Sequence, residues 1–385
     1  MTQQTSEDQF DLRSVYSDNL PQILKVLNIS LVITSYQAGQ LILIRSDGDT
    51  VTTCSKEFPR PMGVYADQHH LTLGTATQVI DFQRCDGLLD QVRSGYLDNE
   101  QELTKKILEK DEKAMEAFLN ERRKTINQVK KANALYLHRA AITTGMINIH
   151  DIAWGDEGLW VVNSTFSCLA TLAPDSSFIA RWKPPFISEL VPEDRCHLNG
   201  MAMRDGKPRY VTTFNKENRR DSWAEEQQFD DGTLIDVQTS KILVDGMIMP
   251  HSPRYHEGKI YVCESGRGLV WRVDPESGAK TQMIQLPGFL RGMTFLDDIM
   301  LVGLSRVRDS DSNKDMPLRQ EGIETVSGVW LINLNDDSVI AYIKFEDDVD
   351  QIYDIGIIPN GSFPELLDVN NPLIRHLYDY AEDLM

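Results

Sequence analysis

The sequence predicts a single all-β domain, a six-bladed β-propeller with a helical insertion and a C-terminal helical tail. A unit of four short β-rich segments recurs along the chain, once in roughly 40 to 60 residues, which is typical of propeller blades. The turns between these segments are rich in Gly, Asp and Ser. One unit is complete only when the two ends of the chain are joined. We expect the propeller to span residues 20–361.

The clearest unit covers residues 251–286. Its four β-rich segments are HSPRY, KIYVCES, LVWRVD and TQMIQL, and the turns HEG, SGRG and PESGAK separate them. Units with the same order of segments begin at Pro61, His150, Asn199 and Arg291. Four strands per unit, repeated at this spacing, predict blades rather than an open sheet.

The sixth unit is divided between the two ends of the chain. The segment YDIGII, from Tyr353, is a predicted first strand with no partner strands after it. The N-terminal segments LVITSY, QLILIRS and TVTTCS supply the three missing strands. Such closure holds both ends of the chain in one blade and removes exposed sheet edges.

Two segments depart from the β pattern. Residues 93–132 are rich in Glu, Lys and Leu, and their apolar residues have helical spacing. These apolar residues are Leu103, Ile107, Leu108, Met115, Phe118 and Leu119. We expect one or two amphipathic helices here, inserted between the third and fourth strands of the first blade. The insertion is either a packing or dimerisation element or a surface for a protein partner. The acidic tail, residues 362–385, predicts a further helix.

The composition excludes several classes of protein. The net charge of −19 argues against a nucleic-acid-binding surface and against binding to an anionic membrane. No apolar run approaches the roughly 18 residues that a membrane span needs, and the polar N-terminus lacks the pattern of a secretory signal. The five cysteines are scattered and form no C-x-x-C pair. We therefore expect a cytoplasmic protein with free thiols and with no nucleic-acid or membrane partner.

The starts of the predicted first strands carry unusual polar residues. In a propeller these positions crowd around the central channel, and here they are occupied by Pro61, His150, Asn199, His251, Arg291 and Tyr353. His197 lies two residues before Asn199, so the alternation of a strand directs it to the same side. Three neighbouring blades thus each offer a histidine at one mouth of the channel. Long loops fall on the same face, and one of them carries Trp223, which we expect to cover the site.

Three imidazoles at one mouth predict a metal site. We expect His150, His197 and His251 to bind one divalent transition metal (zinc, copper or iron) with a coordination position left open for water or substrate. The metal would lower the pKa of its water to about 7. Asp151 and Glu264 are candidates for orienting a ligand or acting as general base. We expect Arg291 to hold a negative charge of the substrate, Tyr353 to exchange a proton, and Asn199 to orient the bound cofactor or substrate.

These residues favour an enzyme, either a metal-dependent hydrolase or a lyase that acts on a small polar or peptide substrate. A redox-active copper or iron on the same ligands would instead make it an oxygenase or a peptide-modifying enzyme. The rival hypothesis is a non-catalytic propeller that binds a partner protein, with structural histidines.

Four stretches carry a resemblance to a known family: NIHDIAWGDEGLWVVNSTFSCLATL, PPFISELVPEDRCHLNGMAMRDGKPRYVT, MPHSPRYHEGKIYVCESGRG and LPGFLRGMTF. Across about residues 20–361 the chain resembles a bacterial family of conserved hypothetical proteins, some of whose members carry tetratricopeptide repeats. That resemblance supports the repeat unit and implies no activity. More distantly, the architecture is similar to gluconolactonase-like hydrolases, strictosidine-synthase-like proteins and the peptidyl-hydroxyglycine lyase, and the lyase has a three-histidine zinc site at its axis.

Overall fold

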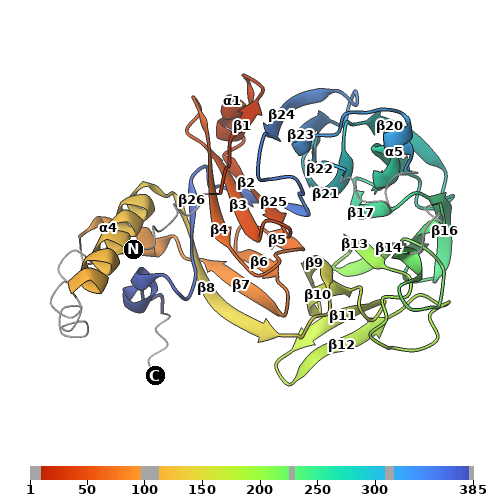
Figure 1. Ribbon diagram of the computed structural model, residues 1–385, viewed down its shortest axis with the longest axis horizontal. Coiled ribbons are helices and arrows are strands. Elements are labelled where there is room, and N and C mark those ends of the chain that lie inside the picture. Colours follow the sequence, from red (N-terminus) through yellow and green to blue (C-terminus); the bar gives the residue numbers. More distant parts are fainter. Residues whose placement is uncertain (1–9, 96, 98–111, 225–229, 308–315, 381–385) are drawn as a thin grey trace, which may run out of the picture.

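Six β-sheets surround a central axis in the computed structural model, which describes residues 10–95, 97, 112–224, 230–307 and 316–380 (Figure 1). Each sheet is one blade, and its first strand lies nearest the axis. Neighbouring strands within a blade are antiparallel, apart from one added outer strand. The predicted six-bladed propeller is therefore confirmed.

The blades are numbered here I to VI, and each is given from its inner strand outward. Blade I contains β25 (Asp354–Pro359), β2 (Ile29–Ser35), β3 (Gln40–Ser46) and β4 (Val51–Glu57). Blade II contains β5 (Val64–Ala66), β6 (His70–Gly74), β7 (Gln78–Arg84), β8 (Ala134–Thr143) and β26 (Pro364–Leu367). Blade III contains β9 (Ile149–Gly155), β10 (Gly158–Asn163), β11 (Cys168–Ala173) and β12 (Ser176–Trp182). Blade IV contains β13 (Leu198–Arg204), β14 (Lys207–Thr213), β15 (Gly232–Asp236) and β16 (Lys241–Met247). Blade V contains β17 (Pro250–His256), β18 (Lys259–Glu264), β19 (Leu269–Val273) and β20 (Lys280–Gln285). Blade VI contains β21 (Phe289–Leu296), β22 (Ile299–Ser305), β23 (Ser327–Asn333), β24 (Val339–Phe345) and β1 (Ser14–Tyr16).

Blade I closes the ring as the sequence predicted. Its inner strand β25 comes from the C-terminal part of the chain and pairs with β2, from Ile29 opposite Pro359 to Thr34 opposite Asp354. Two further strands were not predicted: β1 extends blade VI, and β26 extends blade II in parallel with β8. Both add to an outer edge, where unpaired backbone groups would otherwise be exposed.

The helices lie mostly outside the ring. Those described are α1 (Leu20–Val26), α2 (Gly87–Arg93), α4 (Glu112–Lys131), α5 (Pro317–Gln320) and the 3₁₀ turns η2 (Ser222–Ala224), η3 (Ser265–Arg267) and η5 (Pro372–His376). Within the described residues no helix is long and apolar enough to cross a bilayer.

The helical insertion lies between the third and fourth strands of blade II, as expected, but it begins earlier, at Gly87. It projects from the side of the ring, next to the C-terminal segment (Figure 1). Leu103, Ile107 and Leu108 lie outside the described residues. The tail differs from the expected helix: up to residue 380, where the description of the tail ends, it forms strand β26 and then only the short 3₁₀ turn η5. The physical reason is that β8 offers an unpaired edge, which the tail satisfies with main-chain hydrogen bonds.

Apolar layers between neighbouring blades hold the ring together. Between blades III and IV, for example, Trp160, Val162 and Leu169 pack with Val211 and Ile235. These residues alternate along their strands, which directs them to one face of each sheet. The polar residues at the channel mouth are therefore held by a rigid scaffold of packed sheets.

The inner strands bend at the channel mouth. The register of β9, β13, β17 and β21 with the next strand shifts near one end, as in a β-bulge. In β21 the bend uses Gly292, whose φ is +74°, and a Cβ there would lie 2.9 Å from the Cα of Asp354 in blade I. Gly292 therefore allows two inner strands to approach closely.

Gly292→Ala is expected to lower the free energy of unfolding by about 1–3 kcal/mol more than Gly145→Ala. Gly145 is a matched control, because it has the same φ of +74° but no atom within 4 Å of the place that an added Cβ would occupy. Both variants carry the strain of a positive φ, and only Gly292→Ala adds the clash with Asp354. Urea unfolding measures both values, and equal losses would show that the close approach is unimportant.

Candidate functional site at the channel mouth

Five of the predicted residues gather at one mouth of the channel. His150, His251 and Arg291 lie in inner strands β9, β17 and β21, while His197 and Tyr353 directly precede β13 and β25. The ring centroids of His150 and His197 are 4.6 Å apart, and those of His150 and Tyr353 are 5.5 Å apart. These five side chains therefore lie near one another in the folded chain.

Aromatic rings fill the spaces between the histidines. Phe214 stands between His197 and His251, with centroid distances of 4.6 Å and 5.0 Å. The indole of Trp223, in η2, lies against His197 with ring centroids 3.9 Å apart. Phe289 contacts the other side of His251 at 5.2 Å. The histidines thus form a continuous band with aromatic residues around the mouth.

His251 has a free ring nitrogen. The Oγ of Ser265 donates to the carbonyl of Leu290 at 2.6 Å, so this oxygen accepts from Nδ1 of His251 at 2.8 Å. The carbonyl of Met249 also accepts from Nδ1, at 2.9 Å. These acceptors place the ring proton on Nδ1. The Nε2 lone pair is buried and has no hydrogen-bond partner among the described residues.

The other two histidines are also held through Nδ1. Asn199 donates from Nδ2 to Nδ1 of His150 at 3.2 Å, so Asn199 orients a histidine. Nδ1 of His197 donates to Asp194 at 2.8 Å. His197 has a positive φ of 46°, which turns the chain into the mouth just before β13 begins. Hydrogen bonds of this kind fix the tautomer and the orientation of an imidazole.

Burial sets the protonation of the mouth. It lowers the pKa of His150 well below the usual histidine value, and the nearby His197, Arg291 and His251 lower it further. Burial also lowers the pKa of His251 well below that value, and Arg291 adds to the effect. Burial raises the pKa of Tyr353 well above the usual tyrosine value, although Arg291 opposes this. At neutral pH the mouth therefore holds two neutral imidazoles and a protonated phenol.

Arg291 is surrounded by aromatic rings. Its guanidinium lies 5.1 Å from the ring of Phe289, 5.3 Å from that of Tyr353 and 5.9 Å from that of Tyr36. No described carboxylate forms an ion pair with it, and its Nε has no hydrogen-bond partner among the described residues. The hydroxyl of Tyr353 is likewise buried without a described partner. A guanidinium in this state is available to pair with an anionic group.

A small cavity lies within the mouth. Its volume is about 10 Å³, close to the room that one water molecule needs. The residues that line it come from four blades and are His150, Asp151, Asn199, His251, Ser252, Tyr353 and Asp354. The predicted histidines, asparagine, tyrosine and aspartate therefore share one enclosed space, with the exception of His197.

A buried ionic cluster adjoins this cavity. Nη1 of Arg254 lies 2.7 Å from Oδ2 of Asp151, and Nη2 lies 3.7 Å from Oδ1 of Asp354. Asp151 also accepts from the amide of Met201, and Asp354 accepts from that of Val64, each at 3.0 Å. Each carboxylate therefore links its own blade to the next one. Burial and the neighbouring Asp151 raise the pKa of Asp354 to about 7, against the influence of Arg254.

Glu264 does not line the cavity, although the sequence predicted a catalytic or orienting role for it. Its Oε1 accepts from the amide of Ile248 at 2.9 Å, and its Oε2 accepts from the indole of Trp271 at 2.6 Å. Arg267 forms an ion pair with it at 3.3 Å. A carboxylate so fully occupied has a structural role at this position, because its lone pairs already bind the scaffold.

The three histidines are not arranged as ligands of one metal ion in this geometry. In the part of the chain that the structure describes, no group of three or more His, Cys, Asp or Glu side chains is placed to hold a metal. His150 and His251 share the small cavity, whereas His197 does not line it, and Phe214 contacts both His197 and His251. The donor chemistry is nonetheless suitable at His251, whose free Nε2 is a good nitrogen ligand.

Arg254 is the main residue that sequence reasoning missed. It stands three residues after His251, which in a regular strand would direct it to the opposite face. The register shift between His251 and Arg254 changes this direction. The aligned repeats did contain a signal, because the matching positions of the other blades hold small residues, such as Ala153, Ala202 and Gly356. An arginine at a position where other blades have small residues indicates a side chain that has room to extend across the central axis.

Comparison with known proteins places the fold and the family. A crystal structure of a nidogen/laminin complex contains a chain that is 8% identical, with a TM-score of 0.51 over 86% of this chain and 99% of that chain. A protein of unknown function from Bacteroides caccae is 9% identical over 86% of this chain and 98% of its own, with a TM-score of 0.49. At such identities the likeness concerns the fold alone. No curated protein matches the sequence. The model of one family, domain of unknown function DUF4915, matches residues 18–367, and the chain therefore belongs to this family.

Proposed function

We propose that the channel mouth is the active site of an enzyme that catalyses a hydrolysis or an elimination on a small polar or peptide substrate with a negative charge. One observation carries this proposal. Three buried polar atoms without described partners, Nε2 of His251, Nε of Arg291 and the hydroxyl of Tyr353, come from three consecutive blades at one mouth. Buried polar atoms are normally hydrogen-bonded, so such a group indicates a place for a ligand.

Each of these atoms has a distinct chemical use. The guanidinium of Arg291 can pair with a substrate carboxylate or with an oxyanion that forms during the reaction. The neutral Nε2 of His251 can accept a proton, because burial keeps this imidazole unprotonated. The hydroxyl of Tyr353 keeps its proton and can donate it to a leaving group or an oxyanion. Asn199 orients His150, and Asp151 belongs to the cluster that adjoins the cavity.

A divalent transition metal, either zinc, copper or iron, remains part of this proposal. Nε2 of His251 is the donor that the hydrogen bonds among the described residues leave free. His150 and His197 would complete the predicted ligand set only after their rings move, because the described geometry does not place the three imidazoles around one ion. A bound metal would supply an acidified water or polarise a substrate oxygen. Copper or iron would extend the chemistry to an oxygenase or a peptide-modifying enzyme. The roles given above for Arg291, His251 and Tyr353 do not depend on the metal.

One observation favours the rival function, a non-catalytic propeller that binds a partner protein. His197 lies against Trp223 and Phe214 and is hydrogen-bonded to Asp194, which is the environment of a structural histidine. In that case the rim loops and the helical insertion would hold the partner.

Metal content tests the proposal directly. The protein is purified without a polyhistidine tag and then loaded in turn with zinc, copper and ferrous iron. We expect it to bind one metal ion per chain, and mass spectrometry measures the metal content. His251→Asn is expected to abolish this binding, because asparagine can replace the Nδ1 donor but has no equivalent of Nε2. His256→Asn is the control, since His256 stacks on Phe295 away from the mouth and should retain the metal.

The outcomes separate the candidates. Metal binding that survives in His251→Asn would place the ion elsewhere and contradict the predicted ligand set. Absence of metal under every loading condition would remove the metal from the proposal. If Arg291→Gln and His251→Asn then also leave the binding of carboxylate-bearing peptides unchanged, the mouth is not a substrate site and the binding propeller is favoured. Unchanged urea midpoints would show that the variants are folded.

A further inference from the structure

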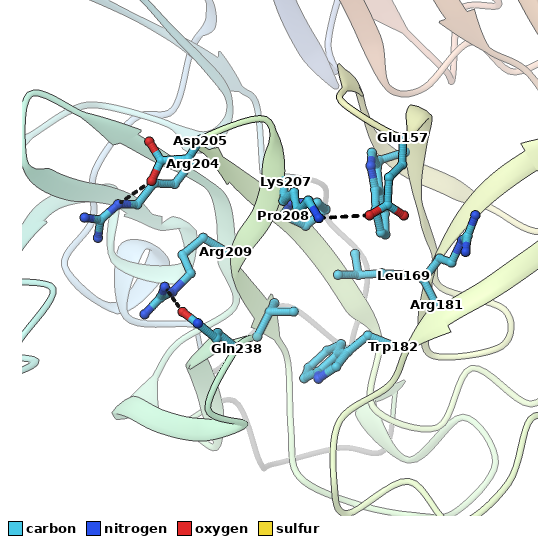
Figure 2. Close-up of a pocket in the computed structure, with 12 residues that line it drawn as sticks. Glu157, Leu169, Arg181, Trp182, Arg204, Asp205, Lys207, Pro208, Arg209 and Gln238 are labelled. Atoms are coloured by element: carbon cyan, nitrogen blue, oxygen red, sulfur yellow. Dashed lines mark hydrogen bonds and ion pairs between the residues drawn. The ribbon is translucent and has the colours of Figure 1, made fainter.

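A larger cavity lies between blades III and IV (Figure 2). None of the residues that line the small cavity at the channel mouth lines this one. Its volume of about 440 Å³ is within the range of small-molecule sites, roughly 300–1,000 Å³. The chemistry of its walls can therefore be considered independently of the proposed active site.

Part of the wall is aromatic and apolar. Trp160 in β10 and Trp182 at the end of β12 both line the cavity, together with Leu169. The Nε1 of Trp182 donates to Ser240 at 3.3 Å, whereas the buried Nε1 of Trp160 has no partner among the described residues. Trp160 is only 7% exposed, so its N–H is a costly donor to leave unpaired.

The rim of the cavity is basic although the whole chain has a net charge of −19. Lys207 forms an ion pair with Glu157 at 3.1 Å, and this pair links blades IV and III at the rim (Figure 2). Two arginines of the rim are also paired with carboxylates, Arg204 with Asp205 at 3.5 Å and Arg209 with Asp236 at 2.7 Å.

Arg181 differs from these three cations. Its Nε donates to the hydroxyl of Thr171 at 2.8 Å, and no carboxylate pairs with it within the described ranges. Arg181 is an exposed residue of the cavity lining, on the same outer strand as Trp182, and no hydrogen bond joins its Nη1 or Nη2 to the described residues. A guanidinium with both terminal nitrogens available can form two parallel hydrogen bonds with a carboxylate or another planar anion.

We propose that this cavity binds a small aromatic anion. The aromatic ring packs against Trp160 and Trp182, and the negative group pairs with Arg181. Indole walls favour a flat apolar ring, because stacked and edge-on aromatic contacts add to the gain from burial. The free guanidinium selects a charged ligand over a neutral one of the same shape.

Calorimetric titration with naphthoate, and with naphthylmethanol as its neutral counterpart, tests the proposal. Naphthoate is expected to bind with a dissociation constant of about 1 mM or tighter, given the usual affinity per atom of such ligands. Naphthylmethanol is expected to bind at least about tenfold more weakly. Arg181→Gln should reduce the affinity for naphthoate to that for the alcohol, while leaving the alcohol unaffected.

Two further variants locate the binding site. Arg123→Gln removes an exposed guanidinium from α4, outside the cavity, and should leave naphthoate binding unchanged. His251→Asn should also leave it unchanged, so failure of the proposed active site and failure of this cavity are distinguishable. Loss of naphthoate binding in His251→Asn but not in Arg181→Gln would place the anion at the channel mouth and overturn the proposal. No binding by the unmodified protein, or equal affinity for acid and alcohol, would overturn it as well.

Discussion

Arg254→Met is expected to lower the free energy of unfolding by about 3–5 kcal/mol, the usual cost of removing one partner of a buried ion pair. Arg254 lies between two buried carboxylates, and it also donates to main-chain carbonyls in two neighbouring blades, those of Met201 and Met293. Its loss would leave Asp151 and Asp354 without their shared cation. Urea unfolding followed by circular dichroism measures the change.

Two controls make this result specific. Arg13→Met removes an exposed arginine with its own ion pairs, and is expected to cost no more than about 1 kcal/mol. The double variant with Arg254→Met and Asp151→Asn should recover part of the loss, because it removes one of the two uncompensated charges. An Arg254→Met protein as stable as the parent would show that the cluster does not hold the inner strands together.

Asp354→Asn is expected to change the pH dependence of stability. The pKa of Asp354 is about 7 in the folded protein and close to 4 in the unfolded chain. Between these values the folded state retains a proton that the unfolded state releases, so protonated Asp354 contributes stability that is lost as the pH rises from about 4 to about 7. Asparagine has no such proton. The variant should therefore gain stability relative to the parent across this range, by up to about 4 kcal/mol.

His150 and His251 change the pH dependence of stability in the opposite direction. Their pKa values lie below the unfolded value of about 6.5, so the stability that their neutral forms contribute is lost as the pH falls. The parent protein and Asp354→Asn both contain these histidines. The difference in stability between the two proteins therefore does not include the contribution of the histidines. Urea unfolding at several pH values from 4.5 to 8, roughly the span of the Asp354 transition, measures the difference. A difference that stays constant with pH would contradict the retained proton on Asp354.

The sequence predicted the polar residues of the channel mouth, because blade register is a property of the repeat. Aligning the first strands brought His150, His251, Arg291 and Tyr353 together without any knowledge of distances. The same alignment gave no information on what each side chain bonds to. The pattern therefore predicts a catalytic or orienting role for Glu264, whereas in the folded protein its carboxylate accepts hydrogen bonds from the indole of Trp271 and the amide of Ile248.

The repeat pattern also does not predict local irregularities of the strands. The bulge after His251 directs Arg254 to the axis, and an expectation based on regular alternation assigns this residue to the wrong face. The tail was predicted to be helical from its composition, yet β26 pairs with the edge of β8, which no local pattern contains. Both differences arise where tertiary contacts override a local preference.

The sequence alone determined the ring of six blades, the joining of the two ends of the chain in blade I, and the presence of His150, His251, Arg291 and Tyr353 at the channel mouth. These features depend on the periodicity of the repeat, and that periodicity is a property of the amino-acid sequence. Tertiary structure alone decided which atoms of those residues are left free. Among the described residues, Nε2 of His251 and Nε of Arg291 have no hydrogen-bond partner, and Arg181 has no carboxylate partner. These states depend on contacts between residues far apart in the chain, because hydrogen bonds and burial depend on spatial neighbours.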